Sequence, residues 1–176
     1  MKDRKFKFTW ELLGNIQRGR PNLGPLTRLE MYRLFQYTLR DTLEQQEGTE
    51  KTNQIFYQAG KLAGKEFYDH LFPKGQPFND FIKSLQKTLR DMGVGILRVE
   101  ESDIDKGLLT LTVSEDLDCS GLPELGYEIC TYDEGFIAGV IERHTGKTIK
   151  IKEIDCWCTG DRTCRFKVEV LDNHPQ

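Results

Sequence analysis

Apolar residues in the first half of the chain recur every three to four positions, which is the period of an α-helix. The pattern predicts three helices, over residues 27–46, 49–72 and 77–92. Thr27 and Glu30 have the spacing of a capping box at the start of the first helix. That helix is apolar on more than one side, so we expect it to lie centrally in the fold or in an interface. Gly60 and Gly64 lie one turn apart on the second helix and should let a neighbouring element approach closely.

Beyond residue 93 the helical period gives way to alternation of apolar and polar residues, which is the pattern of β-strands. The pattern predicts two strands around Leu97–Val99 and Leu109–Val113, joined by a turn at 103–107. After a loop at 115–124 we expect a fourth helix and a second hairpin, over residues 125–145, 148–155 and 163–171. This order of N-terminal helices followed by an antiparallel hairpin–helix–hairpin predicts an α+β fold.

The same patterns divide the chain into an arm, one domain and a tail. Residues 1–26 contain a run rich in glycine and proline and should form an irregular arm. Residues 27–171 are expected to form a single domain, whose N-terminal helices within 27–76 take part in dimerisation. Residues 172–176 are a short tail. A length of 176 residues fits one domain of ordinary size.

Charge and hydropathy argue against nucleic acid as a partner and against a membrane-spanning segment. The net charge of −3 gives no basic surface of the kind that binds nucleic acid. No run of the sequence approaches the roughly 18 apolar residues that a membrane span needs. The N-terminus lacks the apolar stretch of a signal peptide, so we expect a cytoplasmic protein.

All five cysteines lie in the last third of the chain, at positions Cys119, Cys130, Cys156, Cys158 and Cys164. A reducing cytosol disfavours structural disulfides, so clustered cysteines there indicate metal or redox chemistry. Alternation along the last two predicted strands places Glu153 and Cys164 on the core side. A buried carboxylate needs a cationic partner, and a bound metal ion would supply one.

Zinc fits the residues that can meet at this hairpin. Glu153 and Cys156 face the same side only if the strand bends or bulges at residues 154–155. Cys130, on the preceding helix, can then complete a closed tetrahedral set with Cys164, which indicates a structural zinc site. Four alternatives remain open at this point: inert core thiols, a solvated Glu153, a Cys156–Cys164 disulfide, and Cys158 as a substitute for Cys156. Cys119 is interpreted as a non-ligand.

The segment 153–166, together with the stretches 126–130 and 135–139, resembles the 4-vinyl reductase domain family and its stand-alone members. The resemblance implies zinc held by Cys130, Glu153, Cys156 and Cys164, at the separations seen in the aromatic-sensing members of the family. It also implies homodimers and a fold shared with a vesicle-tethering subunit and with haem-based nitric oxide sensors. The reductase activity in the family name does not transfer on fold alone.

A pocket for a ligand is implied between the third helix and the sheet. Seven inward-facing residues have the phase to line it, although ordinary core packing is the better explanation for them: Phe81, Leu85, Leu109, Leu111, Phe136, Val140 and Ile151. The leading hypothesis is a zinc-stabilised module that binds an apolar or aromatic small molecule as a homodimeric sensor or carrier. The alternatives are a vinyl reductase acting on a tetrapyrrole, and an assembly protein resembling the tethering subunit.

Overall fold

The computed structural model describes residues 4–103 and 106–171, and its α+β architecture confirms the predicted fold class. Three helices come first: α2 (Leu29–Glu47), α3 (Thr49–Leu71) and α4 (Phe78–Asp91). Their bounds lie within two residues of the predicted ones. The predicted capping box is wrong, because the N-cap of α2 is Arg28 and Glu30 pairs with the Arg28 side chain instead. No helix in the described part of the chain is long and apolar enough to cross a lipid bilayer.

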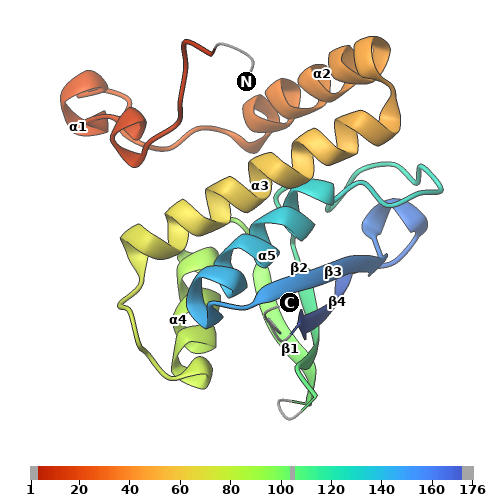
Figure 1. Ribbon diagram of the computed structural model, residues 1–176. Helices are drawn as coiled ribbons and strands as arrows, with labels where there is room; N and C mark the ends of the chain where they lie inside the picture. The colour runs from red at the N-terminus through yellow and green to blue at the C-terminus, as the bar shows by residue number, and fades with distance from the viewer. Residues whose placement is uncertain (1–3, 104–105, 172–176) are drawn as a thin grey trace.

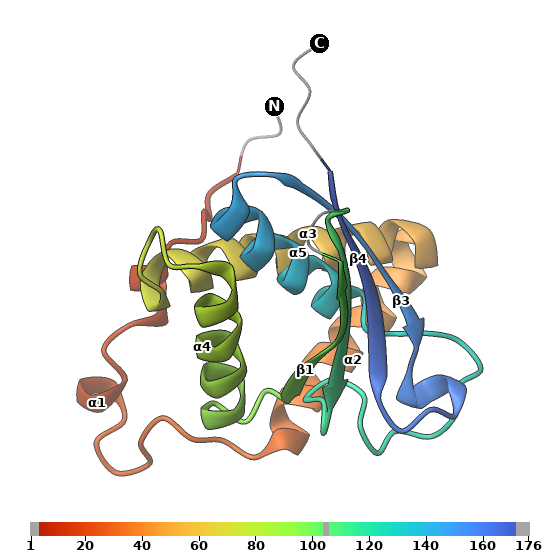
Figure 2. The same cartoon turned by 90° about the horizontal axis from the view of Figure 1, so that it is seen from below.

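The four strands form one antiparallel sheet in the order β1-β2-β4-β3. Their bounds are β1 (Ile96–Asp103), β2 (Leu108–Ser114), β3 (Thr148–Asp155) and β4 (Cys164–Leu171). The turn predicted between the first two strands falls partly on residues 104–105, outside the described residues, as does the tail at 172–176. Figure 2 shows α4 and α5 (Thr131–Thr145) side by side on one face of the sheet, where the core lies. That core contains the fully buried Phe81, Leu111 and Phe166.

Helix α5 begins six residues later than the sequence pattern predicts. Gly126 adopts a left-handed backbone conformation with φ of 80°, which ends any helical run there. The N–H groups of Leu125 and Gly126 both donate to the carbonyl of Cys158, at 2.8 and 3.0 Å. The segment is therefore tied to the β3–β4 connection, and Cys130 is the N-cap of α5 rather than an interior residue.

Helices α3 and α5 cross in direct backbone contact (Figure 1). A Cβ atom on Gly60 would lie 2.0 Å from a carbonyl oxygen of α5, and one on Gly64 would lie 2.2 Å from another. The relationship is reciprocal, since Cβ atoms on Gly135 and Gly139 would lie 2.0 and 2.3 Å from carbonyl oxygens of α3. The close approach predicted for Gly60 and Gly64 is thus confirmed, with α5 as the neighbour.

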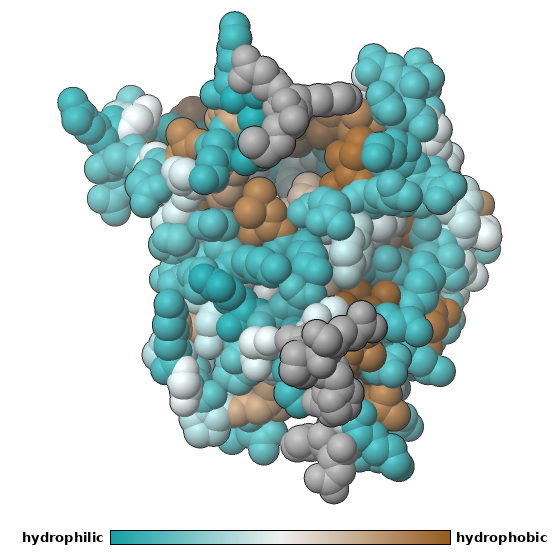
Figure 3. Space-filling view, viewed as in Figure 1, coloured by the Kyte–Doolittle hydropathy of each residue, from teal (hydrophilic) through white to brown (hydrophobic). Residues whose placement is uncertain are grey.

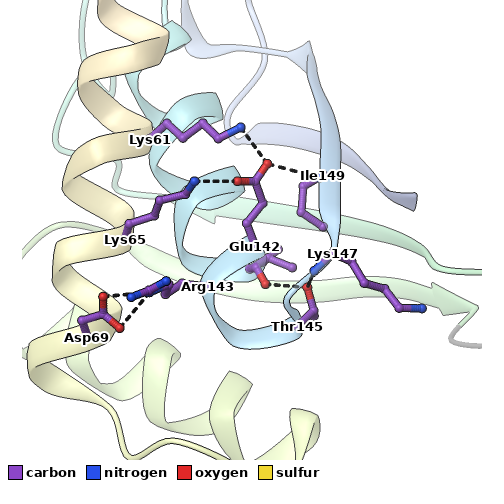
Figure 4. A network of polar contacts seen from close by, with 9 residues as sticks. Lys61, Lys65, Asp69, Glu142, Arg143, Thr145, Lys147 and Ile149 are labelled. Carbon is purple, nitrogen blue, oxygen red and sulfur yellow. Dashed lines mark hydrogen bonds and ion pairs between the residues drawn. The ribbon is translucent and has the colours of Figure 1, made fainter. Parts of the chain in front are cut away.

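Ion pairs also join these two helices (Figure 4). Lys61 and Lys65 of α3 contact the carboxylate of Glu142 on α5, at 2.7 and 3.0 Å. Glu142 also accepts a hydrogen bond from the N–H of Ile149 at the start of β3. Because Glu142 is largely buried, these contacts fix the register of α3, α5 and β3 better than exposed ion pairs would.

The N-terminal arm lies mostly exposed beside α2 and α3. It contains the 3-10 turn η1 (Trp10–Leu13) and the short helix α1 (Ile16–Gly19). Trp10 stacks on His70 of α3, with ring centroids 4.5 Å apart, and this contact holds the arm against the domain. Figure 3 shows hydrophobic residues gathered around the arm and the neighbouring part of α2. Among the large apolar residues of α2, the most exposed are Met31, Leu34 and Phe35.

Candidate metal centre and adjoining cavity

Four cysteine thiols from four separate segments meet at one end of the sheet, where β2 and β3 end and β4 begins. Cys119 comes from the loop after β2, Cys130 caps α5, Cys156 follows β3, and Cys164 begins β4. Their sulfur atoms all lie within 4.8 Å of one another, and all four side chains are buried. The group has the residue types and the burial that a structural metal site requires. All five cysteines of the chain are free thiols in this structure.

A β-bulge brings Glu153 and Cys156 to the same side of β3. The pairing of β3 with β4 shifts register between Glu153 and Asp155, which confirms the bulge predicted at residues 154–155. Glu153 faces the core and is only 2% exposed. The extra residue reverses the alternation, so that Cys156 also turns inward.

The sulfur–sulfur distances test how well the thiols fit zinc. Zinc–sulfur bonds of about 2.3 Å in a tetrahedron place neighbouring sulfur atoms about 3.8 Å apart. Cys130 lies 3.7 Å from both Cys156 and Cys164, which matches two edges of such a tetrahedron. Cys119 lies only 3.0 Å from Cys164, too close for both to bind one zinc ion without adjustment. Cys130, Cys156 and Cys164 therefore fit best.

The predicted fourth ligand, Glu153, lies beside the thiols but outside the group of ligand atoms within 4.8 Å of one another, in which Cys119 is the fourth member. Oε2 of Glu153 accepts a hydrogen bond from the N–H of Cys130 at 3.2 Å, which aims the carboxylate at the thiols. Its Oε1 is buried and has no hydrogen-bond partner in the described part of the chain. Burial, followed by the proximity of Cys156, raises the pKa of Glu153 to about 9. An unpartnered buried oxygen of this kind is what a bound cation would satisfy.

The thiols are electrostatically unequal. Hydrogen bonding from Cys119, Cys130 and Cys164 holds the pKa of Cys156 far below its ordinary value. Hydrogen bonding with Cys119, Cys156 and Cys164, followed by burial, raises the pKa of Cys130. Among the four clustered thiols, Cys156 is the one with a lowered pKa. A divalent ion bound by the clustered thiols would replace their protons and stabilise the thiolate forms.

Cys119 and Cys158 differ from each other in their placement. Cys158 is buried, but it lies outside the group of ligand atoms, and burial raises its pKa to about 12. Cys119 was interpreted as a non-ligand, yet the structure places its sulfur inside the thiol cluster. No pattern in the sequence indicates this position, because Cys119 lies on a loop without periodicity.

Contacts from α2 fix the loop that carries Cys119. Asp118 accepts hydrogen bonds from the hydroxyl of Tyr32 and the amide of Gln36, both at 2.8 Å. Arg33 donates to the carbonyl oxygens of Leu117 and Ser120. The polar side of α2 therefore holds this loop in place, and its apolar side remains exposed.

A small cavity adjoins the thiol cluster, between α4, α5 and the first two strands. Its volume is about 30 Å³, room for a water molecule or two. Apart from two carboxylates, Asp116 and Asp133, the lining residues have no polar side chains. These residues are Ile82, Leu85, Leu89, Val94, Gly95, Leu97, Leu111, Val113, Phe136, Ile137, Val140 and Ile141.

The cavity includes part of the pocket set proposed from the sequence. Leu85, Leu111, Phe136 and Val140 line it, whereas Phe81 is packed in the core beside it. Leu109 and Ile151 border a wider open hollow of about 690 Å³ over the sheet, among charged side chains.

Carboxylates at the polar end of the cavity are strongly perturbed. Burial, followed by the neighbouring Asp118, raises the pKa of Asp116 to about 7. Burial and the charges of Asp116 and Asp118 raise the pKa of Asp133 well above its ordinary value. Ligand atoms of Asp116, Cys130 and Asp133 lie within 4.8 Å of one another, so the cavity and the thiol cluster share a wall.

Comparison with known proteins agrees with the cysteine motif. The model of the V4R domain matches residues 109–170. The uncharacterized protein MJ1642 of Methanocaldococcus jannaschii is 32% identical over 100 residues, which are 57% of this chain and 59% of that protein. Three relatives from this organism are each matched over 54% to 65% of their own length.

Solved structures share the fold at identities of 20% or less. A vinyl-4-reductase family protein from M. jannaschii has a TM-score of 0.58 and 20% identity, with 85% of each chain covered. The phenol-responsive sensory domain of the transcription activator PoxR, solved with phenol, has a TM-score of 0.64 and 17% identity, covering 86% of this chain and 78% of that one.

Two further kinds of protein named by the resemblance also share this fold. A trafficking protein particle complex subunit 3 from Naegleria fowleri, covalently bound to palmitic acid, has a TM-score of 0.64 and 16% identity, covering 82% and 95%. An H-NOX structure has a TM-score of 0.51 and 12% identity, covering 85% and 76%. The fold is therefore the one expected, and residues 109–170 of the chain match the model of the V4R domain.

Proposed function

We propose that this chain is a small-molecule-binding module, stabilised by zinc, that takes an apolar or aromatic ligand into the cavity between α4, α5 and the sheet. One observation carries the proposal: an apolar cavity with a polar end directly adjoins a buried set of metal-ligating side chains. Ligand sites typically combine apolar walls with a few polar groups in this way. Sensing or carrying such a ligand is the role we propose.

Zinc would be held by Cys130, Cys156, Cys164 and Glu153, with Cys119 beside them. Three thiolates and a carboxylate form a donor set that zinc favours, and they leave no position open for a substrate. The ion would supply a structural link between the start of α5 and the β3–β4 hairpin. Since Cys130 also lies beside Asp116 and Asp133, this link would brace the polar end of the cavity.

The cavity must widen to admit an aromatic ring. At about 30 Å³ it holds only a water molecule or two in this conformation. We expect α4 to move, because glycines with positive φ, Gly75 and Gly93, flank it on both sides. One side-chain hydrogen bond, from Gln86 to the carbonyl of Leu97, joins α4 to β1, and apolar contacts supply the rest of this packing.

Two structural neighbours support the proposal. The PoxR sensory domain was solved with phenol, and the trafficking subunit with palmitic acid. Both are proteins of this fold that hold an apolar or aromatic molecule. Phenol is therefore a reasonable first probe for this chain.

Filling the cavity should weaken ligand binding. Leu85→Phe adds volume to a lining residue of α4, so we expect phenol to bind at least about tenfold more weakly than to the wild type. Leu62→Phe makes the same change at an exposed position of α3 and should bind phenol normally. Isothermal titration calorimetry measures both. Equal affinity of the wild type and Leu85→Phe would place the ligand elsewhere, and no binding to any of the three would refute the proposed function.

A homodimer through α2 is the second part of the proposal. Met31, Leu34 and Phe35 are 57%, 58% and 68% exposed, which is unusual for neighbouring large apolar side chains. We expect light scattering to give a dimer of the 20.4 kDa chain, and Phe35→Asp to give a monomer. Gln45→Asp adds the same charge at an exposed polar position of α2 and should remain dimeric. A monomeric wild type at micromolar concentration would contradict this arrangement.

A further inference from the structure

The polar end of the cavity holds a hydrogen-bond acceptor without a donor. Asp133 lies in the first turn of α5 and lines the cavity. Its Oδ2 atom is shielded from solvent and has no hydrogen-bond partner in the described part of the chain. A buried acceptor without a partner costs about 1 to 3 kcal/mol, so such an atom ordinarily receives a bond from water, an ion or a ligand.

The neighbouring acids already have partners, so Asp133 differs from them. Oδ1 of Asp116 accepts bonds from the N–H groups of Asp118 and Cys119, at 2.8 and 3.0 Å. Both oxygens of Asp118 are occupied by Tyr32 and Gln36. Those two acids build the loop, whereas Asp133 keeps an oxygen free at the cavity wall.

No lining residue of the cavity can supply the missing bond. Twelve of the fourteen are apolar side chains or glycine, and the other two are the carboxylates themselves. Arg33 of α2 donates to backbone carbonyl oxygens of the loop that carries Asp116 and Asp118. Apart from the carboxylates, the cavity wall offers no side-chain donor to Asp133, so an occupant of the cavity is a natural source of one.

We propose that the ligand is an apolar molecule with one hydrogen-bond donor, a hydroxyl or an amine N–H. Asp133 accepts a hydrogen bond from this donor, and the apolar walls of the cavity enclose the rest of the molecule. This inference rests on the proposed function, because it specifies the ligand class of the same cavity. Asp133 would then determine specificity, since a site built around a polar partner rejects analogues that lack it. The donor would also lie next to Cys130, so the bound head group would adjoin the metal centre.

Three probes of similar size separate the possibilities. Toluene has no polar group, anisole has an oxygen acceptor but no donor, and phenol has a donor. Titration calorimetry of the zinc-loaded full chain should show phenol binding at least about tenfold more tightly than anisole or toluene. Equal affinities for the three would overturn the assignment of Asp133 while leaving the proposed function intact. A failure of all three to bind would refute both.

Two variants test the residue itself. Asp133→Leu replaces the acceptor with an apolar side chain of similar shape, and it should erase or reverse the preference for phenol over toluene. Asp133→Asn keeps an acceptor oxygen and should keep the preference for phenol, which also guards against a misfolded Asp133→Leu protein. A preference unchanged in Asp133→Leu would overturn the inference.

Metal analysis of the same samples addresses the competing occupant. Because Asp116, Cys130 and Asp133 could together hold an ion, a second zinc per chain that disappears in Asp133→Leu would also overturn the inference. One zinc per chain in both proteins is the expected result.

Discussion

Replacing Cys164 with serine is expected to lower the melting temperature by roughly 10 °C or more and to release the zinc. Cys164 lies 3.7 Å from Cys130 and begins β4, so its thiolate joins the sheet to the start of α5. The unfolded chain has no preformed site, and the free energy of metal binding therefore adds to the free energy of folding. Thermal melts with zinc content measured on the same samples give the result, and a chelator should reproduce it with the wild type.

Two further variants decide the fourth ligand. Glu153→Gln should lose affinity for zinc, because it removes the negative charge of a buried carboxylate whose Oε1 has no partner and whose Oε2 accepts from the N–H of Cys130. Cys119→Ser should keep the zinc, because Cys119 lies too close to Cys164 to share the tetrahedron. Cys158→Ser, at a buried cysteine outside the cluster, is the matched control and should melt near the wild type. A Cys164→Ser protein that melts within a degree or two of the wild type would show that the cluster is only core.

Alanine at Gly135 is expected to destabilise the fold by about 3 kcal/mol or more. The added Cβ would lie 2.0 Å from a backbone carbonyl oxygen of α3, which cannot turn aside as a flexible side chain could. Helices α3 and α5 would have to separate along their whole crossing, and the paired contact of Gly139 would be lost with it. Urea denaturation measures the free energy of unfolding.

The matched control for that change is Gly19→Ala in α1. Gly19 is helical too, and a Cβ atom there would meet nothing within 4 Å. Its free energy of unfolding should equal that of the wild type or exceed it slightly, since alanine favours a helix. If Gly135→Ala proves as stable as this control, the close crossing of α3 and α5 is incorrect.

Periodicity predicted the regular elements and part of the site. Alternation placed Glu153 inward, and the conflict between its phase and that of Cys156 required the bulge that the structure contains. Both conclusions depend on a strand's period of two, which the local sequence fixes. The glycine spacing on α3 similarly indicated a close neighbour, although only the tertiary structure identifies α5.

The loops could not be predicted in this way. The path of residues 115–130 depends on contacts made far away in the sequence, such as those from Tyr32 and Gln36 to Asp118. For this reason the sequence missed Cys119 in the cluster and extended α5 too far towards the N-terminus. Phase likewise identifies residues that face the core, but it cannot show where packing leaves a gap. Leu85 therefore lines the cavity and Phe81 does not.

Mapping of backbone amide shifts by NMR would show whether a ligand enters the cavity between α4, α5 and the sheet. Phenol is titrated into the zinc-loaded, ¹⁵N-labelled full chain. We expect the largest shift changes at amides along α4, α5 and β2, around Leu85, Phe136 and Leu111. Shift changes confined to the exposed face of α2 or to the outer side of the sheet, or none at saturating phenol, would contradict it.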